Sequence, residues 1–358
     1  MILCLSSDAI PKYKRDIVRA LGQPNGSRLQ FRYSDKYIDQ GTLDLISGEV
    51  TTEHSKQAEA QKCLVAFFDG QDTSLTPEIV PCRYATLESA EVVGTTVTLV
   101  MILGNLACSD DLRGFNQGVR STIGGVLARR EGGELVGKFC CLLKSEPPNV
   151  NESASLDRWE QIVAQLASKQ AFEVGTCFYS FEGIYEVEAK IPLNMQNASY
   201  TLAPGKDYEV RLYLRYVSRS ADTDRFLGAI QLQVAASNKR LQFTTNTVLD
   251  IDSRYDRKVI RFRTSKPTTE KLTVVSVSRK EFGEHQPIFD FDLLFKVQGR
   301  VLYNLGLAAI IGVALATPPL IELFKLTSPK LTAVLYIALY LGAGYVAAFH
   351  IEKPLSGE

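Results

Sequence analysis

The chain has 358 residues, of which 45% are hydrophobic, and its 40 basic and 40 acidic side chains give a formal net charge of zero. This balance excludes a general attraction to nucleic acid based on bulk charge. The length is sufficient for two folded domains and a further segment.

The seven cysteines are scattered over the first half of the chain and form no Cys-x-x-Cys pair. This usage predicts reduced, buried thiols and favours a reducing compartment. The N-terminal stretch Met1 to Leu5 is too short for the core of a signal peptide, and positive charge follows it rather than precedes it. We therefore expect the region before the C-terminal apolar segments to stay in the cytoplasm.

Residues 1–148 predict a mixed, strand-rich domain. Leu29 to Tyr33 alternates like a strand after an Asn25-Gly26 turn. Residues 63–68 and 97–103 predict two more strands, and residues 53–62 a short helix.

Arginines in this domain are candidates for an anion pocket. Because nothing in their spacing brings them together, separate surface charges are the favoured interpretation. The candidates are Arg28, Arg32, Arg83, Arg113 and Arg120.

Residues 149–171 predict a connecting amphipathic helix that follows Pro147-Pro148. Ser155 is its expected N-cap. One face at helical spacing consists of Leu156, Trp159, Ile162, Val163 and Leu166.

Residues 172–299 change to a period of two, which predicts an antiparallel β-sandwich of immunoglobulin-like size. The stretch from Tyr208 to Tyr216 shows the pattern, with apolar side chains alternating with outward ones. Turn residues such as Pro204-Gly205 separate the strands.

A basic face is expected on this sandwich, because residues 206–266 hold 13 Lys or Arg and 7 Asp or Glu. Arg211 and Arg215 share one outward strand face. Arg261 and Arg263 share another, which makes these four arginines the candidate ligand-binding residues. Scattered solvated charge is the favoured interpretation. The alternatives are contact with anionic lipid, a phosphorylated ligand or nucleic acid.

Residues 300–351 predict a transmembrane hairpin, with helices at 301–324 and 331–350 and a tail at 352–358. Small residues four apart would let the two helices pack closely or form oligomers. These predicted packing residues are Ala308, Gly312, Ala316, Ala338 and Gly342.

Catalytic, cofactor and metal motifs find little support. The three histidines, His54, His285 and His350, have no neighbours that suggest a catalytic set. Asp250, Asp252 and Asp256 lack the glycine and final glutamate of a calcium loop. We expect no enzyme activity, no cofactor and no metal.

The predicted fold class is thus a mainly β, α+β region followed by a two-helix transmembrane hairpin. It predicts an inner-membrane, multi-pass effector or sensor with cytoplasmic termini. Its expected partners are the lipid bilayer, further copies of the chain, and a protein or small-molecule trigger. Nucleic acid is not indicated. This order of domains is similar to that of membrane-acting effectors of bacterial antiviral defence systems. The alternatives are a tail-anchored adaptor for protein partners and, third, a membrane-bound enzyme.

Overall fold

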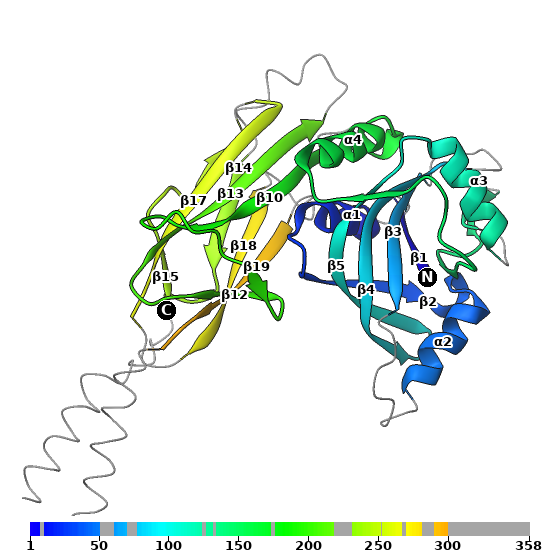
Figure 1. Ribbon diagram of the computed structural model, residues 1–358, viewed down its shortest axis with the longest axis horizontal. Helices are drawn as coiled ribbons and strands as arrows, with labels where there is room; N and C mark the ends of the chain where they lie inside the picture. Colours follow the sequence, from blue (N-terminus) through cyan, green and yellow to red (C-terminus); the bar gives the residue numbers. More distant parts are fainter. Residues whose placement is uncertain are drawn as a thin grey trace, which may run out of the picture.

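The computed structural model describes residues 1–7, 11–50, 61–69, 77–123, 127–131, 134–172, 176–217, 231–251, 253–266, 270–280 and 290–299 (Figure 1). This part of the chain is mostly β and contains four α-helices. The helices are α1 (Pro11–Gly22), α2 (Gln40–Val50), α3 (Leu112–Thr122) and α4 (Leu156–Ala167). Two 3-10 turns are η1 (Asp35–Tyr37) and η2 (Gln170–Phe172).

The first sheet has the strand order β2-β5-β4-β3-β1-β8, with β9 paired to β5. Its neighbouring strands are antiparallel except for β1 and β3, which run parallel. Its strands are β1 (Ile2–Ser7), β2 (Arg28–Ser34), β3 (Lys62–Phe68), β4 (Ile79–Val93), β5 (Thr96–Cys108), β8 (Cys140–Leu142) and β9 (Asn151–Ser153). A separate small hairpin consists of β6 (Arg129–Glu131) and β7 (Glu134–Val136).

Sequence pattern explains where these strands lie in the sheet. The side chains of β1 are buried along its whole length, as expected for a central strand covered on both faces. In β2, Leu29, Phe31 and Tyr33 are buried while the residues between them are exposed. This alternation leaves the outward face of β2 polar, and it confirms the predicted strand at residues 29–33.

A β-sandwich follows, with a four-stranded sheet of order β10-β13-β17-β15 and a six-stranded sheet of order β11-β12-β19-β18-β14-β16. The first of these comprises β10 (Thr176–Glu186), β13 (Asp207–Val217), β15 (Leu241–Phe243) and β17 (Tyr255–Thr264). The second comprises β11 (Met195–Gln196), β12 (Ser199–Leu202), β14 (Gln231–Ala236), β16 (Val248–Asp250), β18 (Lys271–Lys280) and β19 (Asp290–Val297).

Aromatic side chains join the two sheets of the sandwich. The rings of Phe262 in β17 and Phe295 in β19 lie 5.3 Å apart, and Tyr208 stacks on Phe262 at 5.9 Å. Tyr208, Val210, Leu212, Leu214 and Tyr216 are all buried, as their period of two predicts. One pairing differs from the expected antiparallel arrangement, because β12 and β19 run parallel.

Helix α4 contacts β4 and β5 of the first sheet and β10 of the sandwich (Figure 1). The Ser155 hydroxyl accepts a hydrogen bond from the Arg158 amide, which confirms the predicted N-cap. Trp159, Ile162, Val163 and Leu166 are buried, so this helix uses its apolar face to hold the two β-structures together.

The end of α1 forms a second, tighter joint between the first sheet and the sandwich. Gly22, the last residue of α1, lies against the Tyr179 ring of β10, and a Cβ atom at position 22 would overlap that ring. Tyr179 is fully buried and stacks on Phe291 of β19 with ring centroids 4.4 Å apart. The ring therefore has no space into which it could retreat.

The final part of the predicted fold class is wrong. Within the described residues no helix is long and apolar enough to cross a membrane. The longest of them, α1 and α4 with 12 residues each, extend about 18 Å against the roughly 30 Å of a bilayer core. The predicted spans at 301–324 and 331–350 lie outside the described residues. Hydropathy alone indicates an apolar run, not the structure that the run adopts. The expected two-helix hairpin and inner-membrane location are therefore wrong, and the described residues form a mostly β structure with four helices. The lipid bilayer as a partner stays a prediction.

Gly22→Ala is expected to lower the free energy of unfolding by about 1–3 kcal/mol, because the added methyl group meets the immobile Tyr179 ring. Urea unfolding followed by circular dichroism measures this change. Gly41→Ala is the matched control, since a Cβ atom there lies 3.6 Å from its nearest neighbour, an ordinary contact. An equal loss in both variants would show that Gly22 has no special role.

Candidate functional site

A cleft of about 530 Å³ lies between the first sheet and the sandwich. Three arginines line it from α1 and β2, namely Arg19, Arg28 and Arg32. The sandwich contributes apolar groups, among them Val274 and Leu294. The cleft therefore has a cationic wall and an apolar wall that come from different parts of the fold.

The period of two in β2 explains the cationic wall. Arg28 and Arg32 lie four residues apart on the exposed face of the strand. The Arg28 Nε atom donates a hydrogen bond of 2.7 Å to Glu88 Oε2, which orients that side chain. The Tyr13 hydroxyl of α1 donates to the Arg32 carbonyl at 2.9 Å, which ties the helix to the strand.

Two carboxylates moderate the charge of the cleft. Asp16 and Asp292 also line it, and the Ser276 hydroxyl donates to Asp292 Oδ1 at 2.6 Å. The Arg32 guanidinium makes no hydrogen bond or ion pair within the part of the chain that the structure describes. Its donors are thus available to an anion that enters the cleft.

A second hollow, of about 400 Å³, lies beside the end of α1 and is lined by residues of α1, α4 and β10. Gln23 lines both hollows, so this residue stands between them. The Gln23 Oε1 and Trp159 Nε1 atoms are buried and have no hydrogen-bond partner among the described residues. Buried polar atoms without partners are uncommon in folded proteins, so these two atoms show that the hydrogen bonding of this junction is incomplete.

Arg83 of β4 holds the end of α1 in place from inside the protein. Its Nη1 atom donates to the carbonyls of Ala20 at 2.8 Å and Gln23 at 2.7 Å, and its Nε atom donates to Gly104 at 2.7 Å. Its Nη2 atom donates to the Asn25 side chain. Burial lowers the pKa of Arg83 to about 10, so the guanidinium stays charged at neutral pH. A buried cation bonded to the last carbonyls of a helix compensates the negative end of the helix dipole.

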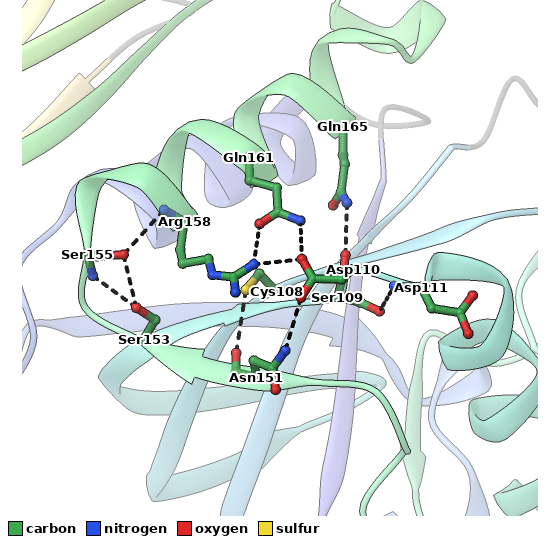
Figure 2. A network of polar contacts seen from close by, with 10 residues as sticks. All are labelled: Cys108, Ser109, Asp110, Asp111, Asn151, Ser153, Ser155, Arg158, Gln161 and Gln165. Carbon is green, nitrogen blue, oxygen red and sulfur yellow. Dashed lines mark hydrogen bonds and ion pairs between the residues drawn. The ribbon is translucent and has the colours of Figure 1, made fainter.

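A polar network fixes α4 to the end of the first sheet (Figure 2). Asp110 Oδ1 accepts from Arg158 Nη1 at 2.6 Å and from Gln161 Nε2 at 2.7 Å. Asn151 of β9 donates to the other Asp110 oxygen at 3.3 Å. The hydrogen bond from Gln161, followed by that from Arg158, lowers the pKa of Asp110. The charged groups of this cluster, Asp110 and Arg158, both bond to their neighbours, so we assign the cluster to positioning rather than to chemistry.

The sandwich arginines predicted from the sequence share one surface. Arg211 and Arg215 of β13 lie on the outer face of their sheet, and Arg261 and Arg263 lie on the same face of β17. The register pairs Arg261 with Glu209 and Arg263 with Asp207. The structure thus brings together the two pairs that the sequence placed on separate strand faces.

The other predicted candidates divide into three groups. Arg28 and Arg32 meet at the cleft, whereas Arg83 is buried and Arg120 donates to the Pro77 carbonyl. Arg113 is exposed on α3.

Among the described residues no group of three or more His, Cys, Asp or Glu is placed to hold a metal ion. His54, His285, His350 and Asp252 lie outside the described residues, as do the predicted packing residues Ala308, Gly312, Ala316, Ala338 and Gly342.

Sequence reasoning missed Arg19 and the capping role of Arg83. The alternation of Arg28 and Arg32 with Leu29 and Phe31 was a signal for a shared outward face. No comparable signal exists for Arg19, because the approach of α1 to β2 depends on tertiary packing.

Sequence comparisons add no functional information, since no protein-family model and no curated protein matches the chain.

Asp110→Asn is expected to change the pH dependence of stability. Hydrogen bonds lower the pKa of Asp110 in the folded protein below its usual value of about 3.9 in an unfolded chain. The ionised carboxylate therefore stabilises the fold fully at pH values above this unfolded pKa. That contribution is lost as the pH falls through the lowered pKa. The melting temperature of the wild type should therefore exceed that of the variant at pH 6, and the difference should shrink towards pH 2.5. Parallel curves over this range would contradict the assignment.

Proposed function

We propose that the chain is a sensor that binds a small multivalent anion, with phosphate or carboxylate groups, in the cleft between its first sheet and its sandwich. The observation that carries the proposal is the convergence of Arg19, Arg28 and Arg32 on one cleft. Guanidinium groups suit such anions because their N–H donors form a planar fork.

The cationic and apolar walls of the cleft favour a ligand that has both an anionic group and an apolar part. The arginines would hold its anionic end, while Val274 and Leu294 offer an apolar surface to the remainder. Binding pockets combine a few oriented polar groups with apolar walls in this way. Metabolites that carry a phosphate beside an organic group meet both requirements.

A ligand in the cleft would contact both β-structures at once. Its binding free energy would then add to the packing of α1 and α4 across the same junction, and it would stabilise one arrangement of the first sheet against the sandwich. This coupling between ligand binding and the arrangement of the two β-structures supports a sensor. None of the contacts described above specifically supports the alternative, an adaptor that docks protein partners. The expectations that the chain forms oligomers and is no enzyme remain predictions.

The proposal predicts that tripolyphosphate raises the melting temperature of the protein, since binding to the folded state alone adds about 2.7 kcal/mol at 100 times the dissociation constant. Arg32→Gln should weaken this binding about tenfold, as charge-assisted hydrogen bonds contribute about 1.5–3 kcal/mol. Thermal unfolding at a series of tripolyphosphate and citrate concentrations gives both constants.

Arg113→Gln is the matched control, because it removes the same charge from an exposed position on α3. It should leave the dissociation constant within a factor of two of the wild-type value. Equal weakening in the two variants, or no shift with either anion in the wild type, would refute an anion site in this cleft.

A further inference from the structure

The outer face of the sheet β10-β13-β17 carries arginines and tyrosines side by side. We call it the arginine–tyrosine face. It consists of Arg211, Arg215, Arg257, Arg261, Arg263, Tyr185, Tyr213 and Tyr255. Four of these arginines were predicted from the sequence as a basic face. Arg257 and the three tyrosines complete it.

Three guanidinium groups lie over tyrosine rings on this face. Arg211 lies 4.2 Å from the ring centroid of Tyr185. The corresponding distances are 5.5 Å from Arg215 to Tyr255 and 5.7 Å from Arg257 to Tyr213. Each contact comes from two adjacent strands, because the β10-β13 and β13-β17 registers set the partners next to each other. The result is a row of flat cationic and aromatic groups.

Carboxylates hold four of the five arginines in position, and Arg215 instead donates to the Glu160 carbonyl of α4 at 2.9 Å. Glu209 bonds to both Arg211 and Arg261, while Glu182 pairs with Arg257 at 3.2 Å and Asp207 with Arg263 at 3.9 Å. Burial alone would raise the pKa of Glu209, but these two arginines lower it, so the carboxylate stays ionised. The side chains of Arg257 and Arg261 nevertheless remain 66% and 56% exposed. A fourth carboxylate, Glu160 of α4, accepts from the Tyr213 hydroxyl at 2.6 Å. Five arginines against these four carboxylates leave the face with a small cationic excess.

A hollow of about 410 Å³ opens on the same face. Its lining includes Tyr185, Arg211 and Arg257, together with Glu182 and Lys258. A cationic hollow next to an aromatic ring can take a flat heterocycle on the ring and an anionic group on the guanidinium groups.

We propose that the arginine–tyrosine face binds single-stranded nucleic acid. Tyrosine rings and guanidinium planes stack on unpaired bases. Arginines at three outward positions of β17, namely Arg257, Arg261 and Arg263, follow a phosphate backbone. An acidic protein would pair with the arginines but would not stack on the tyrosine rings. The bases of a duplex are stacked on one another, so they cannot stack on these rings either. The zero net charge of the whole chain conceals this local excess.

This surface is separate from the anion cleft. The cleft uses the outward residues Val274 and Leu294 of β18 and β19, which belong to the other sheet of the sandwich. Anion binding in the cleft and nucleic-acid binding on the arginine–tyrosine face can therefore be tested independently. Variants of the cleft residues serve as controls for the nucleic-acid measurement.

The test titrates the full-length protein into a fluorescently labelled oligothymidylate of 20 nucleotides and measures its fluorescence anisotropy at several salt concentrations. The wild type should bind, and the logarithm of its affinity should fall linearly with the logarithm of the salt concentration. Arg257→Ala combined with Arg261→Ala should weaken binding at least tenfold and reduce the slope by about 1.4, since each phosphate contact on a single strand contributes about 0.7.

Tyr255 is 53% exposed, so Tyr255→Ala should also weaken binding, with an unchanged salt slope. The matched control combines Arg113→Ala with Lys144→Ala, which removes two exposed charges elsewhere, and Arg32→Gln tests the cleft. Both controls should bind like the wild type. The proposal is overturned if the wild type fails to bind the oligonucleotide, or if the Arg113→Ala and Lys144→Ala control loses as much affinity as the Arg257→Ala and Arg261→Ala variant. It is also overturned if Tyr255→Ala has no effect and poly-glutamate competes as well as unlabelled oligothymidylate.

Discussion

The placement of the end of α1 is the constraint on which the rest of the arrangement depends. Arg83 reaches this helix end from β4 and donates to its last carbonyls. It is buried, and among the described residues no carboxylate pairs with it. Removing such a group would leave several buried acceptors unsatisfied, at about 1–3 kcal/mol for each. Gly22 then lets the helix end approach Tyr179, whose ring stacks on Phe291. Cation, glycine and aromatic stack together fix how the first sheet meets the sandwich.

The two proposed binding surfaces depend on this joint to different degrees. The cleft needs it, because Arg19 and Arg32 come from one side and Leu294 from the other. A change in the angle between the two β-structures would open or close the cleft, and a ligand that bridges the walls would oppose that change. The arginine–tyrosine face lies within a single sheet, so its geometry follows from strand register alone.

Sequence patterns predicted what depends on local spacing. Alternation in β2 and β13, the apolar face of α4 and its Ser155 cap all follow from periods of two or 3.6 and from capping chemistry. Contacts between distant segments were beyond this reasoning. The parallel pairing of β1 with β3, the bonds from Arg83 to α1 and the meeting of Arg19 with Arg28 depend on tertiary packing. The predicted membrane hairpin failed for a related reason, because an apolar run does not by itself specify the structure that it forms.

Ion pairs at the two surfaces orient the arginines more than they neutralise them. Exposed pairs such as Arg28 with Glu88 contribute only about 0–1 kcal/mol, since solvent screens them. A phosphate that offers two oxygens to the same guanidinium can therefore displace or share the contact at small cost. The carboxylate meanwhile limits the number of conformations that each long side chain samples before binding, which reduces the entropy lost when a ligand arrives. Glu209, shared between Arg211 and Arg261, does this for two arginines on adjacent strands at once.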